Sequence, residues 1–386
     1  MKTLVAGGGI AGLAAAIAIR KAGHDVAVAE RASELREIGA ALSLWPNAIA
    51  ALGHLGLAEQ TMERSIEAPT ASIRSMTGGT LVRFDTHAMR RALHGLPVVV
   101  LRADLQATLL EECRRRDIEV RLSNDVLGVR PDRDKMIVDV SNGEAAYDAV
   151  IGADGINSTV RSSVAGPDRR RDCKRTAWRA VIANEDGLID HTWLTVGVAL
   201  QLIASPAPDG SAYWAADTPN GNRSEEGDPA LKQELLGYFG DWHDPIPAVI
   251  DATPPESLIV TDIFDRPPPK QLSRGAVALV GDAAHAMTPD LGQGACQGLE
   301  DAAVLLACAD GKKDAAGIFA TYETRRLRHV RTVVRDSYGI GKLATTRHPS
   351  AARLRNGLVR MTPEAVHNRR LARYASVGAL DAQMTG

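Results

Sequence analysis

Several features that would indicate a metal, disulfide or membrane protein are scarce or absent in this sequence of 386 residues. It has only four cysteines, and none of them forms a CxxC pair or another metal-ligand spacing. Such cysteines favour free thiols in a reducing compartment over a disulfide framework. No apolar run reaches the roughly 18 residues that a membrane-spanning helix needs. We therefore expect neither a structural metal nor a membrane span.

Charge excludes further classes of protein. The formal net charge is -2 and 45% of the residues are hydrophobic, so global charge suggests neither nucleic-acid binding nor disorder. Residues 321–373 contain 12 arginines and one lysine against three acids, which a solvated or salt-bridged helix face explains better than a nucleic-acid arm. The first predicted strand starts at Lys2, which leaves no signal peptide. A cytoplasmic protein of two domains is expected.

The chain begins with the pattern of a parallel α/β sheet. Residues 2–6 predict a short buried strand, and the Ala-rich segment up to residue 22 predicts a helix. Residues 25–30 then predict a second strand. A strand, a helix and a strand in this order are typical of a Rossmann-like, doubly wound sheet.

A dinucleotide fingerprint lies between the first strand and the helix. Gly7 permits the tight turn, Gly9 lets the backbone approach a pyrophosphate, and Gly12 lets the helix pack on the strand. The helix N-terminus then faces the anion with unpaired N–H groups. Glu30 follows Gly12 by 18 residues and can accept hydrogen bonds from a ribose diol. The pattern predicts dinucleotide binding without choosing between FAD and NAD.

The middle of the chain changes character. Residues 177–217 alternate between apolar and polar positions and contain turn signals, which predicts an antiparallel sheet in a second layer or domain. Residues 254–275 contain five prolines and are expected to be a passage back to the first domain. Further elements are predicted as a helix at 102–116, strands near 118–130, 136–140, 147–151 and 276–280, and a helix at 292–308.

Two later segments carry chemistry of their own. The first is GADGINSTVR, from Gly152 to Arg161, and the second is GDAAHAMTPDLGQGA, from Gly281 to Ala295. Asp282 lies where a predicted parallel strand ends, which is where ligands bind in open α/β sheets. The glycines after Pro289 predict a turn whose backbone N–H groups point outward at a helix N-terminus.

With the fingerprint, these segments resemble the single-component flavin monooxygenases of the para-hydroxybenzoate hydroxylase type, in their urate hydroxylase-like and salicylate hydroxylase-like branch. The resemblance covers nearly the whole chain. It implies FAD as the cofactor and, because only one fingerprint is present, NADH or NADPH as a transient electron donor. It also implies transfer of one oxygen atom from O₂, through a C4a-hydroperoxyflavin, to an electron-rich aromatic, heteroaromatic or polycyclic substrate.

The resemblance assigns cofactor binding to specific positions and implies no catalytic protein residue, because the flavin carries the chemistry. The implied FAD-binding residues are Gly7, Gly9, Ala11, Gly12, Glu30, Arg31, Ser43, Arg102, Val126, Asp154, Asp282, Pro289, Gly292, Gln293, Gly294 and Ala295. We expect a discontinuous FAD-binding domain, an interleaved antiparallel-sheet substrate domain and a C-terminal helical segment. The predicted FAD-binding domain comprises residues 1–68, 98–172 and 254–345. The predicted substrate domain comprises residues 69–97 and 173–253, and the C-terminal helical segment comprises residues 346–386.

The substrate is less well indicated. Tyr213, Val198, Leu200 and Pro289 are candidate substrate contacts. The predicted strand at 196–200 lacks the arginine that urate-oxidising relatives place there, and Leu202, Ile203 and Trp214 are nearby. We therefore expect a largely apolar substrate rather than urate.

Two other functions remain open from the sequence. A flavin halogenase would share the fold, but the segment at Trp242 has only one of the two tryptophans of the Trp-x-Trp-x-Ile-Pro element of tryptophan halogenases. Another FAD oxidoreductase, or a non-catalytic FAD-binding redox module, is the remaining alternative. His285 is expected to pack within its turn rather than to act in catalysis.

Overall fold

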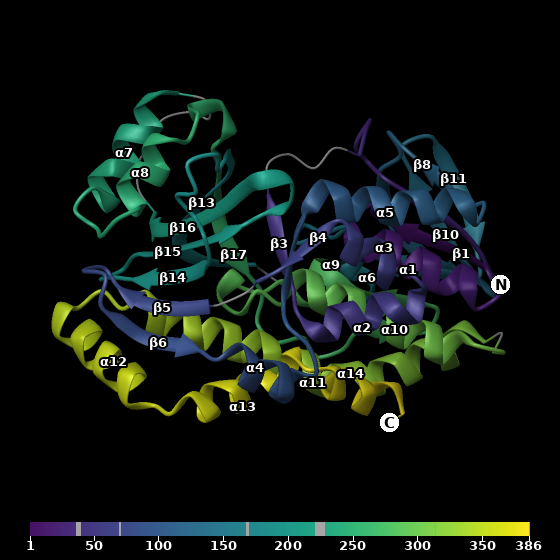
Figure 1. The fold of residues 1–386 in the computed structure, drawn as a ribbon. Coiled ribbons are helices and arrows are strands. Elements are labelled where there is room, and N and C mark those ends of the chain that lie inside the picture. The colour runs from purple at the N-terminus through teal and green to yellow at the C-terminus, as the bar shows by residue number, and fades with distance from the viewer. Residues whose placement is uncertain (36–39, 69–70, 167–169, 221–227, 313, 386) are drawn as a thin grey trace.

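Two large β-sheets lie beside each other in the computed structural model, and one long helix runs beneath both (Figure 1). The structure describes residues 1–35, 40–68, 71–166, 170–220, 228–312 and 314–385. Both chain termini lie beneath or beside the sheet that contains the N-terminal strand (Figure 1).

The first sheet has six strands, of which five are parallel and one, at the edge, is antiparallel. In spatial order they are β18 (Ser273–Arg274), β19 (Val277–Leu279), β12 (Ala149–Gly152), β1 (Lys2–Ala6), β2 (Asp25–Ala29) and β8 (Glu119–Arg121). Consecutive buried residues in β1 and β12 show that both faces are covered, as parallel sheets require. The expected doubly wound sheet is confirmed.

Helix α1 (Ile10–Lys21) forms the centre of this part of the molecule. Every residue from Leu13 to Ile19 has an exposed fraction of 0%. The helix packs against α5 (Arg102–Arg115) and α10 (Gly294–Ala309). Its many alanines favour helix and add little bulk, so neighbouring elements can approach closely.

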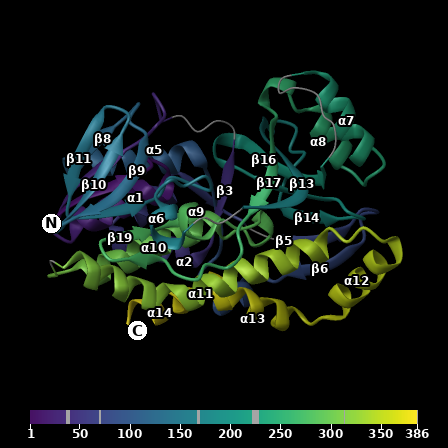
Figure 2. The ribbon, with the colours of Figure 1, turned by 180° about the vertical axis from the view of Figure 1, so that it is seen from behind.

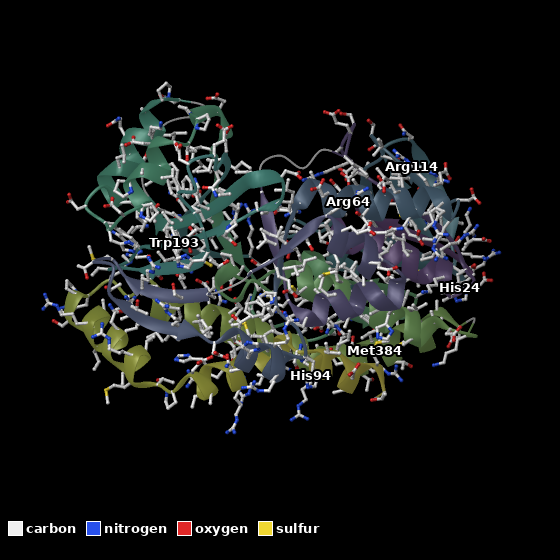
Figure 3. All side chains as sticks on the ribbon, viewed as in Figure 1. His24, Arg64, His94, Arg114, Trp193 and Met384 are labelled. Carbon is white, nitrogen blue, oxygen red and sulfur yellow. The ribbon has the colours of Figure 1, made fainter. Side chains whose placement is uncertain are left out.

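The second sheet has seven strands and is mainly antiparallel. In spatial order they are β17 (Ile259–Asp265), β13 (Arg171–Ala183), β16 (Ser211–Pro219), β15 (Gln201–Pro206), β14 (Thr192–Val196), β5 (Ala71–Ser75) and β6 (Thr80–Phe84). One face packs against α7 (Ala230–Phe239) and α8 (Ile246–Asp251) through a core that includes Trp178, Trp193 and Trp214. Trp193 is labelled in this sheet in Figure 3.

The structure corrects two expectations in this region. Residues 259–265 form an edge strand paired with β13, whereas we had expected 254–275 to lead back to the FAD-binding domain. The flanking prolines suggested a linker, but proline is tolerated next to an edge strand. Residues 197–200 form a turn between β14 and β15 rather than a strand. Ala199 has φ 61°, and a Cβ at Gly197 would lie 2.6 Å from the Trp242 ring.

Smaller elements complete the fold. Two three-stranded sheets consist of β3 (Ala41–Leu44), β7 (Val98–Leu101) and β4 (Ser65–Glu67), and of β11 (Gly143–Tyr147), β10 (Lys135–Val140) and β9 (Val126–Asp132). The remaining helices are α2 (Pro46–Leu55), α3 (Ala58–Glu63), α4 (Thr86–Leu93), α6 (Arg161–Ala165), α9 (Gly281–His285), α11 (Ala315–Ala344), α12 (Pro349–Met361), α13 (Glu364–Ala375) and α14 (Val377–Met384). Single 3₁₀ turns are η1 (Pro208–Gly210), η2 (Pro255–Ser257) and η3 (Pro289–Leu291).

Helix α11 joins the two parts of the molecule. Its 30 residues span about 45 Å, and seen from behind it crosses beneath both sheets (Figure 2). Two arginines of the basic C-terminal region are buried: Arg326 of α11, and Arg355, which donates to the Gly197 carbonyl at 2.9 Å. Among the described residues, none of the helices has the length and apolar character to cross a membrane.

A fully buried ion-pair cluster fixes α11 against α10. Arg326 donates to Asp301 Oδ1 at 2.7 Å and to Glu300 Oε2 at 2.5 Å. Asp301 Oδ2 also accepts from the Gly281 backbone N–H at 2.8 Å and lies 2.7 Å from His285 Nε2. His285 is thus packed within the fold, as expected. Burial raises the pKa of Asp301, but the charges of His285 and Arg326 outweigh it and lower that pKa to about 2.

We expect Asp301→Asn to lower the free energy of unfolding by about 3 kcal/mol, because it breaks a buried pair and leaves Arg326 with one carboxylate. The pKa of Asp301 falls from 3.8 to about 2 on folding, so its contribution is complete above pH 3.8 and disappears as the pH falls through about 2. Urea unfolding of both proteins at pH 7 and at acidic pH measures this. A difference that stays constant below pH 3.8 would contradict it.

Candidate FAD and substrate site

The fingerprint turn is built so that only glycine fits at two of its positions. Gly7 has φ 105°, and a Cβ there would lie 2.4 Å from the Ala153 carbonyl oxygen. A Cβ at Gly12 would lie 2.0 Å from the Gly7 carbonyl oxygen. Gly9, at the N-cap of α1, has no atom within 4 Å of its Cβ position, so the backbone there is open to a ligand. Closely packed glycines thus surround one open position, which fits a bound pyrophosphate.

Glu30 follows β2 and is connected to the fingerprint. Its carboxylate accepts from the Gly8 backbone N–H at 2.6 Å and from the Ala32 backbone N–H at 2.8 Å. These bonds hold the acid beside the turn, where a ribose would lie. Arg31, next to it, is exposed. Val126 is buried in the core at the start of β9, so only its backbone is available to a cofactor.

The second motif acts mainly on its own turn. The Asp154 carboxylate accepts from Ser158 Oγ at 2.5 Å and from the backbone N–H groups of Thr159 and Val160 at 2.7 and 3.1 Å. The aspartate therefore shapes the turn before α6. This turn adjoins the fingerprint, because a Cβ at Gly7 would lie 2.4 Å from the Ala153 carbonyl oxygen and 3.0 Å from the Asp154 backbone nitrogen. The expected position of the Asp154 carboxylate near the pyrophosphate stays a prediction.

The third motif begins at the end of β19. Gly281, the first residue of α9, has φ 55°, and a Cβ there would lie 2.6 Å from the Cβ of Ala11, so the start of α9 and the fingerprint helix are in close contact. Asp282 comes next and is exposed. Within the described part of the chain its carboxylate has no hydrogen-bond partner. An exposed, unpaired carboxylate at this sheet edge is available to a ribityl or ribose hydroxyl.

The turn before α10 presents backbone rather than side chains. Pro289 and Gly292 are exposed, and Gly292 has φ 60°. The Gln293 side chain points inward, where its Oε1 accepts from Asn47 Nδ2 at 3.1 Å. Gly294 has open space at its Cβ position, and Ala295 follows it in the first turn of α10. The N–H groups of this first turn have no intrahelical partners, so they suit a negatively charged ring.

Two other expected residues lie at the edge of the same region. Arg102 is the first residue of α5, and its backbone N–H donates to the Ala40 carbonyl at 2.9 Å. One turn further along α5, Gln106 Nε2 lies 3.4 Å from the Gly8 carbonyl oxygen, so this helix start reaches the fingerprint. Ser43 is exposed on β3, the strand that follows residue 40.

The seven-stranded sheet turns a second face away from α7 and α8. Cross-strand register places Tyr213, Ala215 and Asp217 of β16 on this face, together with alternate residues of β13 and β15. Tyr213 packs against a cluster that includes Ala41 and Val99 of β3 and β7. Burial raises the pKa of Tyr213, and the Arg102 charge acts on the same hydroxyl in the opposite direction. This face therefore lies toward the FAD-binding elements.

A buried polar cluster ties this face to the turn before α10. Arg175 of β13 donates to both Asp290 oxygens, at 3.0 and 2.9 Å, and also to Asp217. Gln201 Nε2 donates to Asp217 at 2.7 Å and to Asp290 at 3.1 Å. Burial raises the pKa of Asp217, and the Asp290 charge adds to this against the effect of Arg175. Asp290 sits between Pro289 and Leu291, so the turn is fixed relative to the seven-stranded sheet.

Some expected substrate residues lie elsewhere. Leu200 packs against the core behind the sheet, where Leu202 and Trp214 are also buried. The turn containing Val198 contacts the C-terminal helices, since Ala199 N–H donates to the Thr346 carbonyl at 2.9 Å. Hence neither Val198 nor Leu200 is among the cross-strand partners that share a sheet face with Tyr213 and Asp217. Trp242 is buried against Phe239, which gives it a structural role.

Sequence reasoning missed the polar residues of the seven-stranded sheet. Arg175, Arg179, Gln201 and Asp217 all project from strands toward the FAD-binding elements. The available signal was a charged residue at an inward position of an alternating strand. It could not be used before the register showed which face was inward.

Comparison with known proteins agrees with this geometry. The model of the FAD binding domain family matches residues 1–219 and 269–337. The chain belongs to the FAD binding domain family. The match contains the fingerprint, the Asp154 segment and the turn before α10, which are the segments that meet at the ends of the parallel strands.

Similar members of the FAD binding domain family are monooxygenases. The chain is 32% identical to aurachin C monooxygenase/isomerase of Stigmatella aurantiaca, over 94% of each protein. It is also 32% identical to an FAD-dependent urate hydroxylase of Klebsiella pneumoniae, over 86% of this chain and 88% of that protein. The crystal structure of Klebsiella pneumoniae HpxO with FAD and uric acid superimposes with a TM-score of 0.89 at 29% identity, covering 100% of this chain and 97% of that one. This chain is an FAD-dependent monooxygenase of the aromatic hydroxylase branch.

Two alanine substitutions separate the fold of the fingerprint from its ligand. We expect Gly9→Ala to leave the free energy of unfolding of the FAD-free protein within about 0.5 kcal/mol of wild type, because its Cβ meets no atom. It should weaken FAD binding at least tenfold, because the methyl group occupies the open position. FAD titration by flavin fluorescence and urea unfolding measure the two effects.

Gly12→Ala is the matched comparison. Its Cβ would lie 2.0 Å from the Gly7 carbonyl oxygen, so we expect it to destabilise the FAD-free protein by about 1–3 kcal/mol. Equal stability losses in the two variants would contradict the assignment of Gly9 as the open position.

Proposed function

We propose that FAD lies across the carboxyl ends of β1, β2, β12 and β19, with its ring between the turn at 289–295 and the inner face of the seven-stranded sheet. There the enzyme would oxygenate an electron-rich aromatic or heteroaromatic ring. The observation that carries this proposal is the Arg175–Asp290 bond, because it joins the turn expected to face the ring to the sheet expected to hold the substrate.

The protein's own part is to bind, orient and exclude water. When bound, FAD supplies electron transfer from NADH or NADPH and the activation of O₂. Gly7, Gly9 and Gly12 accommodate the pyrophosphate, and Glu30 and Asp282 accept from its hydroxyl groups. The start of α10 directs N–H groups toward the negative end of the reduced ring, a helix-dipole effect of about 0.3–2 kcal/mol. A substrate held between the turn and the sheet would displace water from the reacting ring.

The proposed FAD-binding and substrate-binding parts of the chain correspond to the two large sheets. We propose that residues 1–68, 98–172 and 266–345 bind FAD and that residues 69–97 and 173–265 hold the substrate, with 346–386 as supporting helices. This moves β17 from the FAD-binding part to the substrate part. The remaining FAD-binding residues predicted from the sequence keep their assignments, with backbone contacts for Val126 and Gln293.

We also propose a cytoplasmic enzyme whose partners are O₂, NAD(P)H and a small organic molecule, without nucleic acid. The four cysteines are all unpaired, which suits a reducing compartment. Burial raises the pKa of Cys113 and Cys296 to about 12, so these thiols are unreactive at neutral pH.

Reconstitution tests the proposal. The protein should take up one FAD, turn yellow and oxidise NADH or NADPH faster when a suitable phenol or hydroxylated heteroaromatic compound is present. Under ¹⁸O₂ the product should gain one labelled oxygen atom. Asp282→Ala should weaken FAD binding about tenfold, since it removes one acceptor worth about 1–1.5 kcal/mol. A protein that binds no flavin, or a product labelled only from water, would overturn the proposal.

A further inference from the structure

One arginine on the inner face of the substrate sheet stands apart from every other charge. Arg179 lies in the middle of β13 and is partly buried. Among the described residues its guanidinium has no hydrogen bond, ion pair or aromatic partner. By contrast, Arg175, two positions along the same face and beyond Ala177, donates through both terminal nitrogens to Asp217 and Asp290. A partly buried guanidinium without an acceptor is unusual, because it loses hydration and gains nothing in return.

The register shows what surrounds Arg179. Directly opposite partners run across all seven strands in one row, which consists of Val82, Ile73, Leu194, Ile203, Ala215, Arg179 and Ile259. Val82, at the β6 end, is buried, and the other members of the row are partly buried. Arg179 is its only charged side chain. The row is therefore an apolar strip with a single cation near one end.

Both neighbouring rows contact the FAD-binding elements. On one side, Asp217 and Gln201 reach Asp290 in the turn before α10 through direct hydrogen bonds or Arg175. On the other side, Tyr213 packs beside β3 and β7. The Arg179 row lies between these two lines of contact yet remains partly exposed. This is the position that a ring held against the flavin would occupy.

The acid in the adjoining row does not pair with Arg179. Asp217 is one register step away on β16, and its Oδ2 accepts from Arg175 and Gln201 instead. The Arg179 charge nevertheless acts on Tyr213, where it opposes the rise in the pKa of that hydroxyl caused by burial. In the register, Tyr213 lies in the adjoining row, one same-face position along β16 from Ala215, the direct partner of Arg179. The two side chains therefore offer donors at neighbouring positions of this face.

We propose that Arg179 binds the substrate through an anionic oxygen, so that the substrate is a flat ring system with a carboxylate or an ionised phenol or enol. The apolar members of the row contact the ring, and Arg179 with Tyr213 holds the charged group. This inference rests on the proposed function and deepens it. It also replaces the expectation of a largely apolar substrate, which considered an arginine only at positions 196–200.

Matched ligand pairs test the proposal on the FAD-loaded enzyme. The probes are 3-hydroxybenzoate with 3-hydroxybenzamide, 2-naphthoate with 2-naphthamide, and 4-hydroxyquinoline with 4-methoxyquinoline, titrated by the change in FAD absorbance without NAD(P)H. The ionisable member of at least one pair should bind about tenfold more tightly than its neutral partner. The acid–amide pairs report a carboxylate, and the quinoline pair reports an enol or phenol oxygen.

Variants then assign the preference to one residue. In Arg179→Gln and Arg179→Met the preference should fall to within about twofold, while Arg179→Lys should retain part of it because the charge remains. Arg83→Met is the control, because Arg83 is exposed and pairs with Ser72 in the register of the opposite face. Its ligand preference should match wild type.

The outcomes separate this inference from the proposed function. FAD content and NAD(P)H oxidation are measured first, and a protein without flavin refutes the proposed function itself. If the flavin is bound, three results would each overturn the role of Arg179. They are equal affinity within every pair, no change in FAD absorbance with any ionisable probe, and a preference that persists in Arg179→Met. A merely structural arginine would lower stability without changing the ratio within a pair.

Discussion

The position of the cofactor site depends on one buried carboxylate. Asp301 accepts from the backbone N–H of Gly281 at the end of β19, and it also pairs with His285 and with Arg326 of α11. One side chain thereby fixes a strand end, a turn and two helices to each other. Desolvating these charges is expensive, and it is offset only because each finds a close partner. The turn before α10 inherits its position from this arrangement.

A second cluster of polar side chains fixes the turn before α10 relative to the seven-stranded sheet. Arg175 connects Asp290 of the turn with Asp217 of the substrate sheet, and Gln201 reinforces both. The cluster has two carboxylates for one guanidinium, and burial together with the Asp290 charge raises the pKa of Asp217 against the opposing effect of Arg175. Because the bonds join residues far apart in sequence, the distance between the turn and the sheet is set by side chains rather than by the backbone path. Any substrate between them meets a gap of fixed width.

Local patterns in the sequence predicted the cofactor half well and the substrate half only in outline. Gly7 and Gly12 could be recognised because a backbone turn dictates glycine whatever surrounds it. Asp154 could be recognised from its motif, but its bonds to Thr159 and Val160 could not be predicted, since they depend on how its own turn closes. Strand β17 was mistaken for a linker because its prolines lie at its flanks. Arg179 was missed because a residue's face in a sheet follows from register with strands more than 30 residues away.

The same register explains which parts of the substrate strip can change. The residues in the rows on either side of Arg179 already make structural contacts. One row takes part in the Arg175 cluster, and in the other Tyr213 packs beside β3 and β7. Residues of the middle row, such as Leu194, Ile203 and Ala215, form no side-chain hydrogen bonds and lie between these fixed lines. Replacing them alters the shape offered to a ring without loosening the turn that faces the flavin. If the proposed site is correct, the substrate can therefore be changed through one row of side chains while the turn expected to face the flavin keeps its position.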